Sequence, residues 1–318
     1  AKVYAETLTR GYEYIKNNQV IDELPQREKY FRHACRGGWP FSDRAHGWPI
    51  TDCTSEGLKC ALAMEREVKD PIEESLLEDA VKLILSFQNP EGGWSTYELQ
   101  RGGDWLERLN PSQVFGGIMV DYPYVECTSA CIQALVAARK RFPGKFDAEI
   151  ERAINAGAKF ICGKQQADGG WEGSWAVCFT YGTWFSVWGL RAAGFPTDDP
   201  KIKSACQFLK SHQNVDGGWG EHYSSCIKGE YVAAEKSQTV HTAWALLTLL
   251  KAGEWNTDSV RKAVQFLINS QLENGDWPQE SMVGVFNKTA LINYENYRRI
   301  FPLWALSLYF NALGRESA

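Results

Sequence analysis

Two kinds of helical pattern alternate along the chain. In the first kind, apolar residues recur at three- and four-residue spacing, which predicts amphipathic helices that bury one face. In the second kind, apolar and aromatic residues cover nearly the whole circumference, which predicts helices covered on both sides. The amphipathic segments are 76–88, 150–165, 201–213 and 260–271, and the apolar segments are 53–64, 127–138, 182–194, 241–253 and 301–313.

A repeated turn that ends in tryptophan separates the two patterns. It reads QNPEGGW at 88–94, QQADGGW at 165–171, QNVDGGW at 213–219 and QLENGDW at 271–277, and a degenerate copy, RGGW, ends at Trp39. The glycines permit a tight reversal of the chain. We expect the glutamine to bond backbone groups at a helix end and the tryptophan to be buried over the joint.

The repeating unit is therefore outer helix, turn and inner helix. A threonine near the start of several inner helices is expected to cap them. Inner helices that are covered on both sides predict two concentric rings, so the expected fold is an all-α, α/α toroid (barrel). We expect residues 1–318 to form a single domain of this kind with about five helix pairs, incomplete as given because a closed six-pair toroid needs one more.

The longest interval between repeats contains an insertion at 97–126. Its charges, glycine pairs and proline predict an ordered loop, and ordered loops of this length are often functional. The most apolar part of the insertion is 114–120, which reads VFGGIMV.

Composition narrows the possible functions. The chain has 318 residues, 44% of them hydrophobic, and a net charge of -5, which excludes disorder and disfavours nucleic acid as a partner. No apolar run approaches the roughly 18 residues of a membrane-spanning helix. The first residue is not Met and the N-terminus lacks a signal-peptide pattern, so we expect a trimmed chain or part of a longer one.

Cysteine and histidine are not spaced as metal ligands. The nine cysteines form no CxxC pair, and the five histidines are dispersed. Neither a zinc framework nor a disulfide scaffold is indicated, and we expect reduced, mostly buried thiols, no metal and no cofactor.

One inner-helix start carries an acid, Asp52, within TDCTSE at 51–56. Asp52 could simply cap the helix. However, Cys53 follows it, and a cysteine recurs at the equivalent position of a second repeat, Cys127. A carboxyl group buried among aromatic rings has a raised pKa and can donate a proton, and the faces of those rings stabilise cations. This combination favours carbocation chemistry. The aromatic candidates are Phe41, Tyr97, Trp175, Tyr181, Trp184, Phe185, Trp188, Phe286, Tyr294 and Tyr297.

The repeat and the sequence Asp-Cys-Thr-Ser-Glu together resemble the triterpene cyclases, and the DCTxE form resembles the oxidosqualene cyclases such as lanosterol and cycloartenol synthases. The resemblance runs along essentially the whole chain. It includes GGWPFSDRAHGWPITDCTSEGLK at 37–59, YVECTSACIQAL at 124–135, SWAVCFTYGTWF at 174–185 and GVFNKTALINYENYRRIFPLWAL at 284–306.

The resemblance implies a role for each matching residue. Asp52 matches the acid that protonates the epoxide, and Cys53 and Cys127 match two cysteines that hydrogen-bond and polarise it. Tyr97 matches a tyrosine near the early rings and the deprotonation region. Ile118 falls in the segment that lines the substrate entrance channel. The aromatic residues that match cation-stabilising or cavity-lining positions are Phe41, Trp175, Phe286, Tyr294 and Tyr297.

The same resemblance implies a reaction and a location. The substrate would be (3S)-2,3-oxidosqualene, cyclised without a cofactor to a sterol or triterpene alcohol of the lanosterol, cycloartenol or parkeol type. The family has a second barrel upstream, so this chain looks like the C-terminal part of a longer enzyme. Monotopic membrane association is expected, with 114–120 near the cavity mouth facing lipid. The membrane would be the endoplasmic reticulum or a lipid droplet in a eukaryote, and the cytoplasmic membrane in a bacterium.

Three alternatives stay open. A squalene-hopene-type cyclase would use an Asp-x-Asp-Asp cluster, where this chain has Ile50-Thr51-Asp52-Cys53. A protein prenyltransferase β-like barrel would need a zinc site built from Asp, Cys and His. A non-catalytic lipid-binding helical-repeat domain would bind apolar ligands without needing Asp52.

Overall fold

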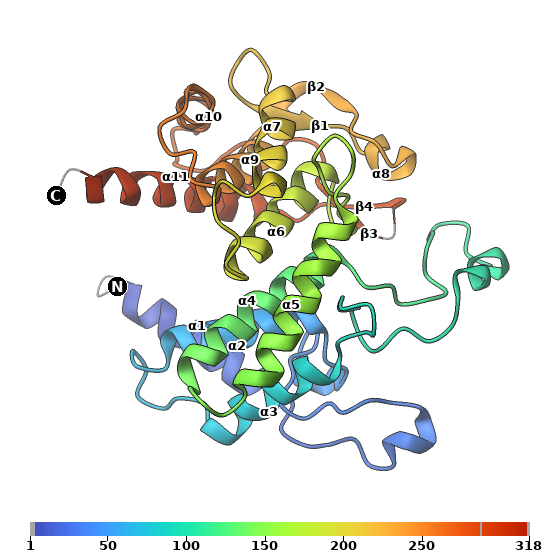
Figure 1. The fold of residues 1–318 in the computed structure, drawn as a ribbon. Coiled ribbons are helices and arrows are strands. Elements are labelled where there is room, and N and C mark those ends of the chain that lie inside the picture. Colours follow the sequence, from blue (N-terminus) through green and yellow to red (C-terminus); the bar gives the residue numbers. More distant parts are fainter. Residues whose placement is uncertain (1–3, 287, 317–318) are drawn as a thin grey trace. The chain divides into compact units, whose positions relative to one another are not determined.

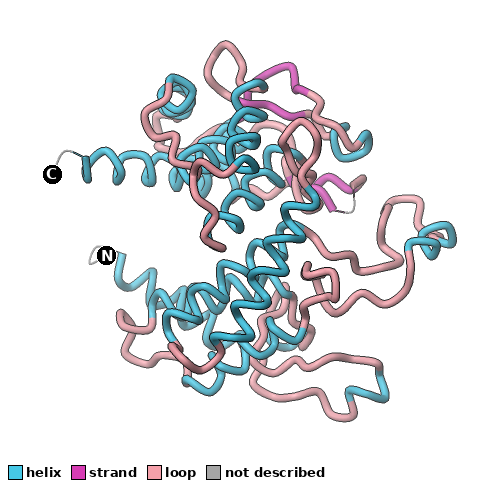
Figure 2. The backbone as a smooth tube through the Cα atoms, in the orientation of Figure 1, coloured by secondary structure: helices cyan, strands magenta, loops and turns pink. Residues whose placement is uncertain are grey.

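The computed structural model describes residues 4–286 and 288–316, and these residues are mostly helical (Figures 1 and 2). The chain divides into two compact units, one of residues 1–102 and 121–161 and one of residues 103–120 and 162–318. The alternation predicted from sequence is confirmed, because each outer helix is followed by a turn and an inner helix. The pairs are α1 (Ala5–Asn18) with α2 (Thr51–Met64), α3 (Glu74–Ser86) with α4 (Val125–Arg141), α5 (Asp147–Lys164) with α6 (Phe179–Ala192), α7 (Pro200–Ser211) with α9 (Thr239–Lys251), and α10 (Asp258–Asn269) with α11 (Tyr297–Glu316).

In the first unit, the inner helices α2 and α4 pack against each other, and α1 and α3 pack against α2. The interface is built from fully buried side chains such as Leu58 of α2 and Leu135 of α4. Short 3-10 helices lie in the segment between α1 and α2, at η2 (Arg27–Tyr30) and η3 (Arg44–His46).

In the second unit, α9 is the central helix, and α6, α7, α10 and α11 all pack against it. Every residue from 239 to 250 is buried, as the apolar circumference of this segment predicts. Small antiparallel hairpins, which the sequence analysis did not predict, join the helices. The remaining elements are η4 (Asp104–Leu109), α8 (Ser224–Lys228), β1 (Trp219–Glu221) paired with β2 (Ala233–Gln238), and β3 (Gly284–Phe286) paired with β4 (Ala290–Ile292).

A repeat tryptophan closes the end of the outer helix that precedes it at Trp39, Trp94, Trp219 and Trp277. The indole N–H of Trp94 donates to the Ile84 carbonyl at 2.7 Å, and that of Trp219 donates to the Leu209 carbonyl at 2.7 Å. These carbonyls lie in the last turn of their helices, where each accepts the indole N–H in addition to the backbone N–H of Phe87 or His212. The predicted burial is confirmed for Trp39, Trp94, Trp171, Trp219 and Trp277.

The glutamine ties its turn to the next outer helix in the repeats of Gln88, Gln165 and Gln213. Gln88 donates from Nε2 to the Gly92 carbonyl and to the Ala153 carbonyl of α5, both at 2.8 Å. Gly92 has a φ of +98°, and a Cβ on it would lie 2.4 Å from the Ala156 carbonyl oxygen, so both its backbone conformation and its contact require glycine. In the degenerate first copy, Gln19 bonds the Gly37 carbonyl at 2.8 Å.

The prediction that a threonine caps the inner helices is wrong. The residues preceding α2, α4 and α9 make no side-chain cap bond, and the threonine lies inside the first turn of each helix. Its hydroxyl oxygen accepts the backbone N–H of the repeat tryptophan: Thr128 serves Trp94 at 3.0 Å and Thr242 serves Trp219 at 2.9 Å. The threonine therefore fastens the turn to the inner helix.

The prediction that α11 is covered on both sides is also wrong. Phe301 and Ala305 are buried on the face that packs against α9 and α10, whereas Ile300, Leu303 and Phe310 are exposed. Among the described residues, no element of the second unit covers the face of α11 that carries these three residues.

Candidate active site

Asp52 is the second residue of α2 and is half-buried. Burial raises the pKa of its carboxyl group to about 6, and the charge of Glu56 adds to this effect. The backbone N–H of Cys53, which donates to Oδ1 at 2.9 Å, acts in the opposite direction because it stabilises the carboxylate. Burial outweighs the helix N-terminus, so Asp52 holds its proton more tightly than an ordinary aspartic acid.

The two neighbouring thiols differ in their contacts. Cys53 is hydrogen-bonded to the Asp52 carboxyl group, and its pKa is raised by burial and by the charge of Asp52. Cys127 is fully buried in α4 and shares a hydrogen bond with the Thr51 side chain. Burial and the charge of Asp52 raise its pKa well above the usual value. Both thiols therefore remain protonated donors at neutral pH.

Tyr97 is held next to the start of α2 by backbone bonds. The Thr51 N–H donates to the Thr96 carbonyl at 2.8 Å, and the Thr51 hydroxyl donates to the Ser95 carbonyl. The half-buried Tyr97 ring lies 5.0 Å from the Trp48 ring. Burial, with the charges of Asp121, Cys53 and Asp52, raises the pKa of Tyr97, so its phenol is neutral. The first unit thus brings together Asp52, Cys53, Cys127 and Tyr97.

The second unit brings together most of the predicted aromatic residues. The Val285 N–H donates to the Trp175 carbonyl at 3.3 Å, and the Val177 N–H donates to the Val283 carbonyl at 2.8 Å. These bonds lay β3 along the segment before α6. The rings of Trp175 and Phe286 consequently lie 5.3 Å apart between centroids.

A glycine allows the next pair of rings to approach. A Cβ on Gly284 would lie 2.4 Å from the Tyr294 ring, so only glycine leaves room for that ring against β3. Tyr294 in turn stacks on Tyr297 with centroids 4.8 Å apart. Four predicted residues, Trp175, Phe286, Tyr294 and Tyr297, therefore belong to one neighbourhood.

Further rings that sequence reasoning missed extend this neighbourhood. Phe115, in the insertion, meets Phe286 edge-on at 5.3 Å. Trp244 of α9 contacts Tyr181 at 5.1 Å and Tyr297 at 6.0 Å. Trp244 has the spacing of an inner-helix residue, so the sequence does not distinguish it from an ordinary core residue. Phe115 could be predicted only if the position of the folded insertion were known.

Two predicted residues lie at exposed positions. Phe41, between α1 and α2, is 69% exposed, and Ile118, in the insertion, is 42% exposed. Their predicted cavity-lining and channel roles remain predictions.

Two other carboxylates, the buried Glu221 and the half-buried Glu280, serve as helix anchors. Glu221 accepts the N–H groups of Phe179 and Thr180 at the start of α6, both at 2.9 Å, and Glu280 accepts the Thr239 N–H at the start of α9. At the start of α2, a backbone carbonyl takes the place of such an anchor. Because the Thr96 carbonyl accepts the Thr51 N–H, Asp52 need not anchor the first residue of α2, although its carboxyl group accepts the Cys53 N–H in the same turn.

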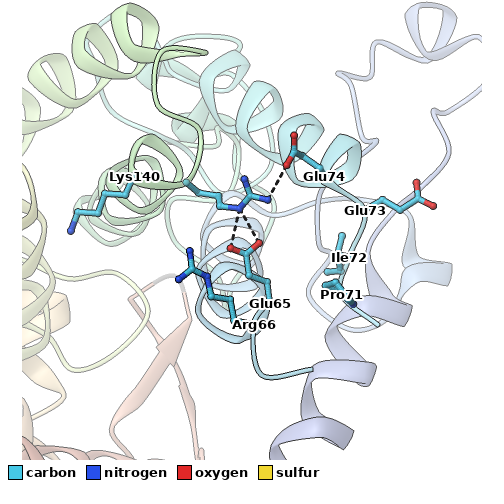
Figure 3. Close-up of a pocket in the computed structure, with 8 residues that line it drawn as sticks. Glu65, Arg66, Pro71, Ile72, Glu73, Glu74 and Lys140 are labelled. Carbon is cyan, nitrogen blue, oxygen red and sulfur yellow. Dashed lines mark hydrogen bonds and ion pairs between the residues drawn. The ribbon is translucent and has the colours of Figure 1, made fainter. Parts of the chain in front are cut away.

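A surface hollow of about 610 Å³ lies at the other end of α2 and α4 (Figure 3). Its lining is charged: Arg141 donates from Nε to Glu65 at 2.9 Å and from Nη2 to Glu74 at 2.8 Å. A lining of paired charges does not suit a hydrocarbon ligand. The acid end of these helices is the better candidate for the reacting site.

Residues 1–311 match the squalene-hopene cyclase C-terminal domain. The chain belongs to this family. The cyclase resemblance stated from sequence is thereby confirmed.

Curated relatives of this cyclase domain are named as sterol-forming synthases. The chain is 45% identical to lanosterol synthase of Mus musculus over 311 residues, which are 96% of this chain and 42% of that protein. It is 44% identical to lanosterol synthase of Homo sapiens and 48% identical to cycloartenol synthase of Dictyostelium discoideum, covering 43% and 44% of those proteins and 96% and 97% of this chain. The cyclase domain described here thus spans less than half the length of the curated relatives it matches.

Solved structures confirm the α/α toroid class of the cyclase domain. The type II terpene cyclase MstE from Scytonema superposes with a TM-score of 0.57 at 18% identity, covering 89% of this chain and 69% of that chain. The ent-copalyl diphosphate synthase from Streptomyces platensis superposes with a TM-score of 0.57 at 16% identity, covering 97% and 50%.

Residues 4–286 and 288–316 of the cyclase domain contain neither a membrane-spanning helix nor a metal-binding cluster. No helix there is both long and apolar enough to cross a bilayer. No group of three or more His, Cys, Asp and Glu side chains there is arranged to hold a metal ion.

Proposed function

We propose that this chain carries the initiating acid of an oxidosqualene cyclase. The observation that carries the proposal is the half-buried Asp52 at the start of an inner helix, whose pKa burial raises to about 6. The relatives named lanosterol and cycloartenol synthases support it. Because the chain spans less than half of those proteins, the activity belongs to a longer enzyme whose preceding part supplies the second barrel.

The reaction is an isomerisation that needs no cofactor. The Asp52 carboxyl group donates its proton to the epoxide oxygen of (3S)-2,3-oxidosqualene, and the carbon–oxygen bond breaks to leave a hydroxyl group and a carbocation. Alkene electron pairs then close the rings one after another, and loss of a proton from carbon ends the cascade. The product is a sterol or triterpene alcohol of the lanosterol, cycloartenol or parkeol type.

The surrounding side chains have distinct tasks. Cys53 and Cys127 orient and polarise the acid, Cys53 through its hydrogen bond to the carboxyl group and Cys127 through the neighbouring Thr51. Tyr97, as a neutral phenol, lies near the early rings and the deprotonation region. The rings of Trp175, Phe286, Tyr294 and Tyr297 stabilise cations through their faces. Phe41 completes the cavity lining, and Ile118 lines the entrance channel.

The insertion is the proposed contact with lipid. Val114, Ile118 and Met119 are 56%, 42% and 37% exposed, which suits a segment that faces a lipid phase at the mouth of the cavity. Such a contact would let a water-insoluble C30 substrate enter the cavity directly from the lipid phase. The enzyme is then monotopic, on the endoplasmic reticulum or a lipid droplet in a eukaryote and on the cytoplasmic membrane in a bacterium.

The choice of substrate separates the proposal from its nearest alternative. A strained epoxide accepts a proton from a weaker acid than an alkene does, and Asp52 has no second aspartate beside it. The full-length enzyme should therefore convert 2,3-oxidosqualene and leave squalene unchanged, as measured by mass spectrometry of extracted products. Conversion of squalene would indicate a squalene-hopene-type activity, and binding of both lipids without conversion would indicate a lipid-binding domain.

A further inference from the structure

Asp121 gathers three successive backbone N–H groups around one carboxylate. Oδ1 accepts from Thr96 at 3.1 Å, and Oδ2 accepts from Tyr97 at 2.7 Å and from Glu98 at 3.3 Å. The Ser95 hydroxyl donates to the Asp121 backbone carbonyl at 2.8 Å. A carboxylate that holds three adjacent N–H groups fixes the backbone of the residue in the middle, which is Tyr97.

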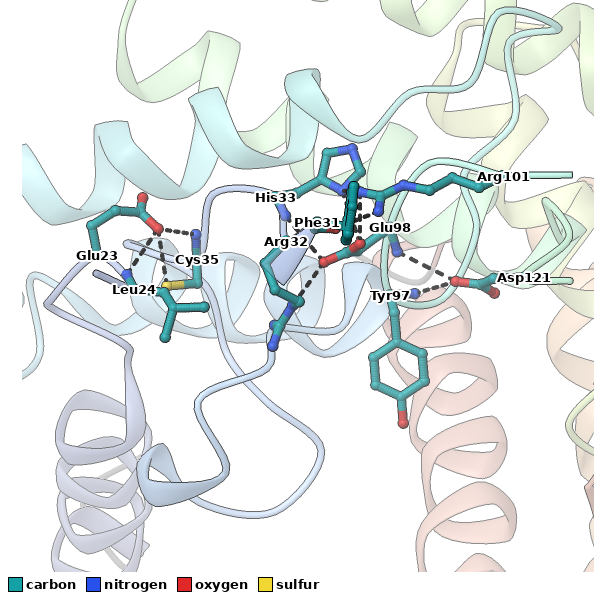
Figure 4. Close-up of polar contacts among 10 residues, drawn as sticks. All are labelled: Glu23, Leu24, Phe31, Arg32, His33, Cys35, Tyr97, Glu98, Arg101 and Asp121. Carbon is teal, nitrogen blue, oxygen red and sulfur yellow. Dashed lines mark hydrogen bonds and ion pairs between the residues drawn. The ribbon is translucent and has the colours of Figure 1, made fainter. Parts of the chain in front are cut away.

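The side chain of Glu98 anchors the same segment from another direction (Figure 4). It accepts from Arg32 Nε at 2.9 Å, pairs with His33 Nδ1 at 3.0 Å and pairs with Arg101 at 3.1 Å. Although burial acts the other way, the bonds from His33 and Arg32 hold the pKa of Glu98 below its usual value. Glu98 is therefore ionised at neutral pH, whereas burial raises the pKa of the Asp121 carboxyl group, against the N–H groups of Tyr97, Thr96 and Glu98, which stabilise its ionised form.

The Tyr97 ring projects away from these two carboxylates (Figure 4). On its other side it meets Trp48 at 5.0 Å, and the Arg32 guanidinium lies 3.9 Å over that indole. The bond from Thr51 to Thr96 fastens the segment to the residue that precedes Asp52. The direction of the phenol is therefore set by a backbone segment that is fixed by the carboxylates on one side and by Thr51 on the other.

We propose that Asp121 is a positioning residue that holds the Tyr97 phenol next to the initiating acid. The proposal rests on the proposed function for its consequence in turnover, but its structural content concerns Tyr97 alone. The Asp121 carboxyl group acts through the backbone of residues 96–98, which fixes the direction of the Tyr97 ring, and through the negative charge that it places near that ring. The charged or titratable groups that act on the phenol are Asp121, Asp52 and Cys53.

The first test reads Tyr97 directly and needs no activity. The full-length enzyme is labelled with [13Cζ]-tyrosine, and the Tyr97 signal is identified by its loss in Tyr97→Phe. Asp121→Asn removes the charge and one of the two oxygens that accept the three N–H groups, so the Tyr97 signal should move and its pKa should fall. Asp199→Asn is the matched control, because Asp199 accepts the Lys201 N–H at 2.8 Å at the start of α7. An unchanged Tyr97 signal in Asp121→Asn overturns the proposal.

The second test asks whether Asp121 acts through Tyr97. Asp121→Asn should lower kcat about 10- to 100-fold with little change in KM and should alter the ratio of products, because misplacement of a group weakens only the reacting steps. In a Tyr97→Phe background the same substitution should have no further effect. Equal losses in both backgrounds contradict the proposal, as does an undisturbed product ratio in Asp121→Asn.

A failure of the Asp121 proposal can be distinguished from a failure to fold and from a failure of the proposed function. If Asp121→Asn does not fold, Asp121→Glu replaces it, and its longer side chain should move the Tyr97 signal while retaining the charge; an unmoved signal again overturns the proposal. If the unsubstituted enzyme does not convert oxidosqualene, the proposed function fails, and the tyrosine signal alone decides the role of Asp121.

Discussion

The backbone N–H of Thr51 donates to the carbonyl of Thr96 at 2.8 Å. Each of these residues precedes a candidate for the reaction, Asp52 on one side and Tyr97 on the other. The bond joins the start of an inner helix to the loop that follows a repeat turn. The acid and the phenol therefore take their positions from the backbone of the fold, and changes to the repeat turns should disturb both.

Removing one turn-to-helix bond should lower the stability of the fold. In Thr242→Val the Trp219 N–H loses the hydroxyl oxygen that accepts it at 2.9 Å, and both groups are buried. The expected loss in the free energy of unfolding is about 1–3 kcal/mol. Urea unfolding measures it, with the exposed Thr7→Val as the control. Equal stability of the two variants would show that the bond contributes nothing.

A methyl group at Gly284 should disturb the aromatic neighbourhood. The added Cβ would lie 2.4 Å from the Tyr294 ring, so the ring or β3 must move, at a cost of about 1–3 kcal/mol. Near-ultraviolet circular dichroism should change together with the melting temperature. Gly163→Ala is the control, since nothing lies within 4 Å of a Cβ there. If both variants behave alike, the packing of Tyr294 on Gly284 is unimportant.

Sequence alone predicted the features that repeat. Trp94 and Trp219 recur with the same neighbours, so their burial and the glutamine bonds followed from the pattern. The equivalent of Gln88 in the first copy, Gln19, was missed because the segment between it and Gly37 is much longer. Asp52 was found because its neighbours form a recognisable motif.

The sequence could not predict contacts that depend on the position of a loop in the folded chain. Asp121 acts on the N–H groups of residues 96–98, which every residue type except proline offers, so no side-chain pattern marks the contact. Phe115 meets Phe286 only because the insertion folds against β3. The exposure of one face of α11 depends on which neighbours pack against it, and the apolar segment 301–313 by itself looks similar to the buried segment 241–253.

The raised pKa of Asp52 predicts a pH dependence of stability. The folded state holds this proton up to a pKa of about 6, against 3.8 for an ordinary aspartic acid, so it binds more protons than the unfolded chain between these values. The contribution of Asp52 to the free energy of unfolding is therefore largest below about pH 4. It falls by about 3 kcal/mol as the pH rises through 6.

Urea unfolding of the unsubstituted protein and of Asp52→Asn at several pH values isolates this contribution. The difference in unfolding free energy between the two proteins should decrease from pH 4 to pH 7. A difference that stays constant would mean that folding does not perturb the carboxyl group.

The account depends most on Asp52 as the proton donor. The most direct measurement is product formation from 2,3-oxidosqualene by the full-length enzyme carrying Asp52→Asn, beside Asp199→Asn as a folded control. Asparagine keeps the shape of the side chain but has no acidic proton, so the rate should fall by at least about 10²- to 10⁴-fold while substrate binding and the melting temperature are retained. Cyclisation by Asp52→Asn at a rate near that of the unsubstituted enzyme would contradict the account.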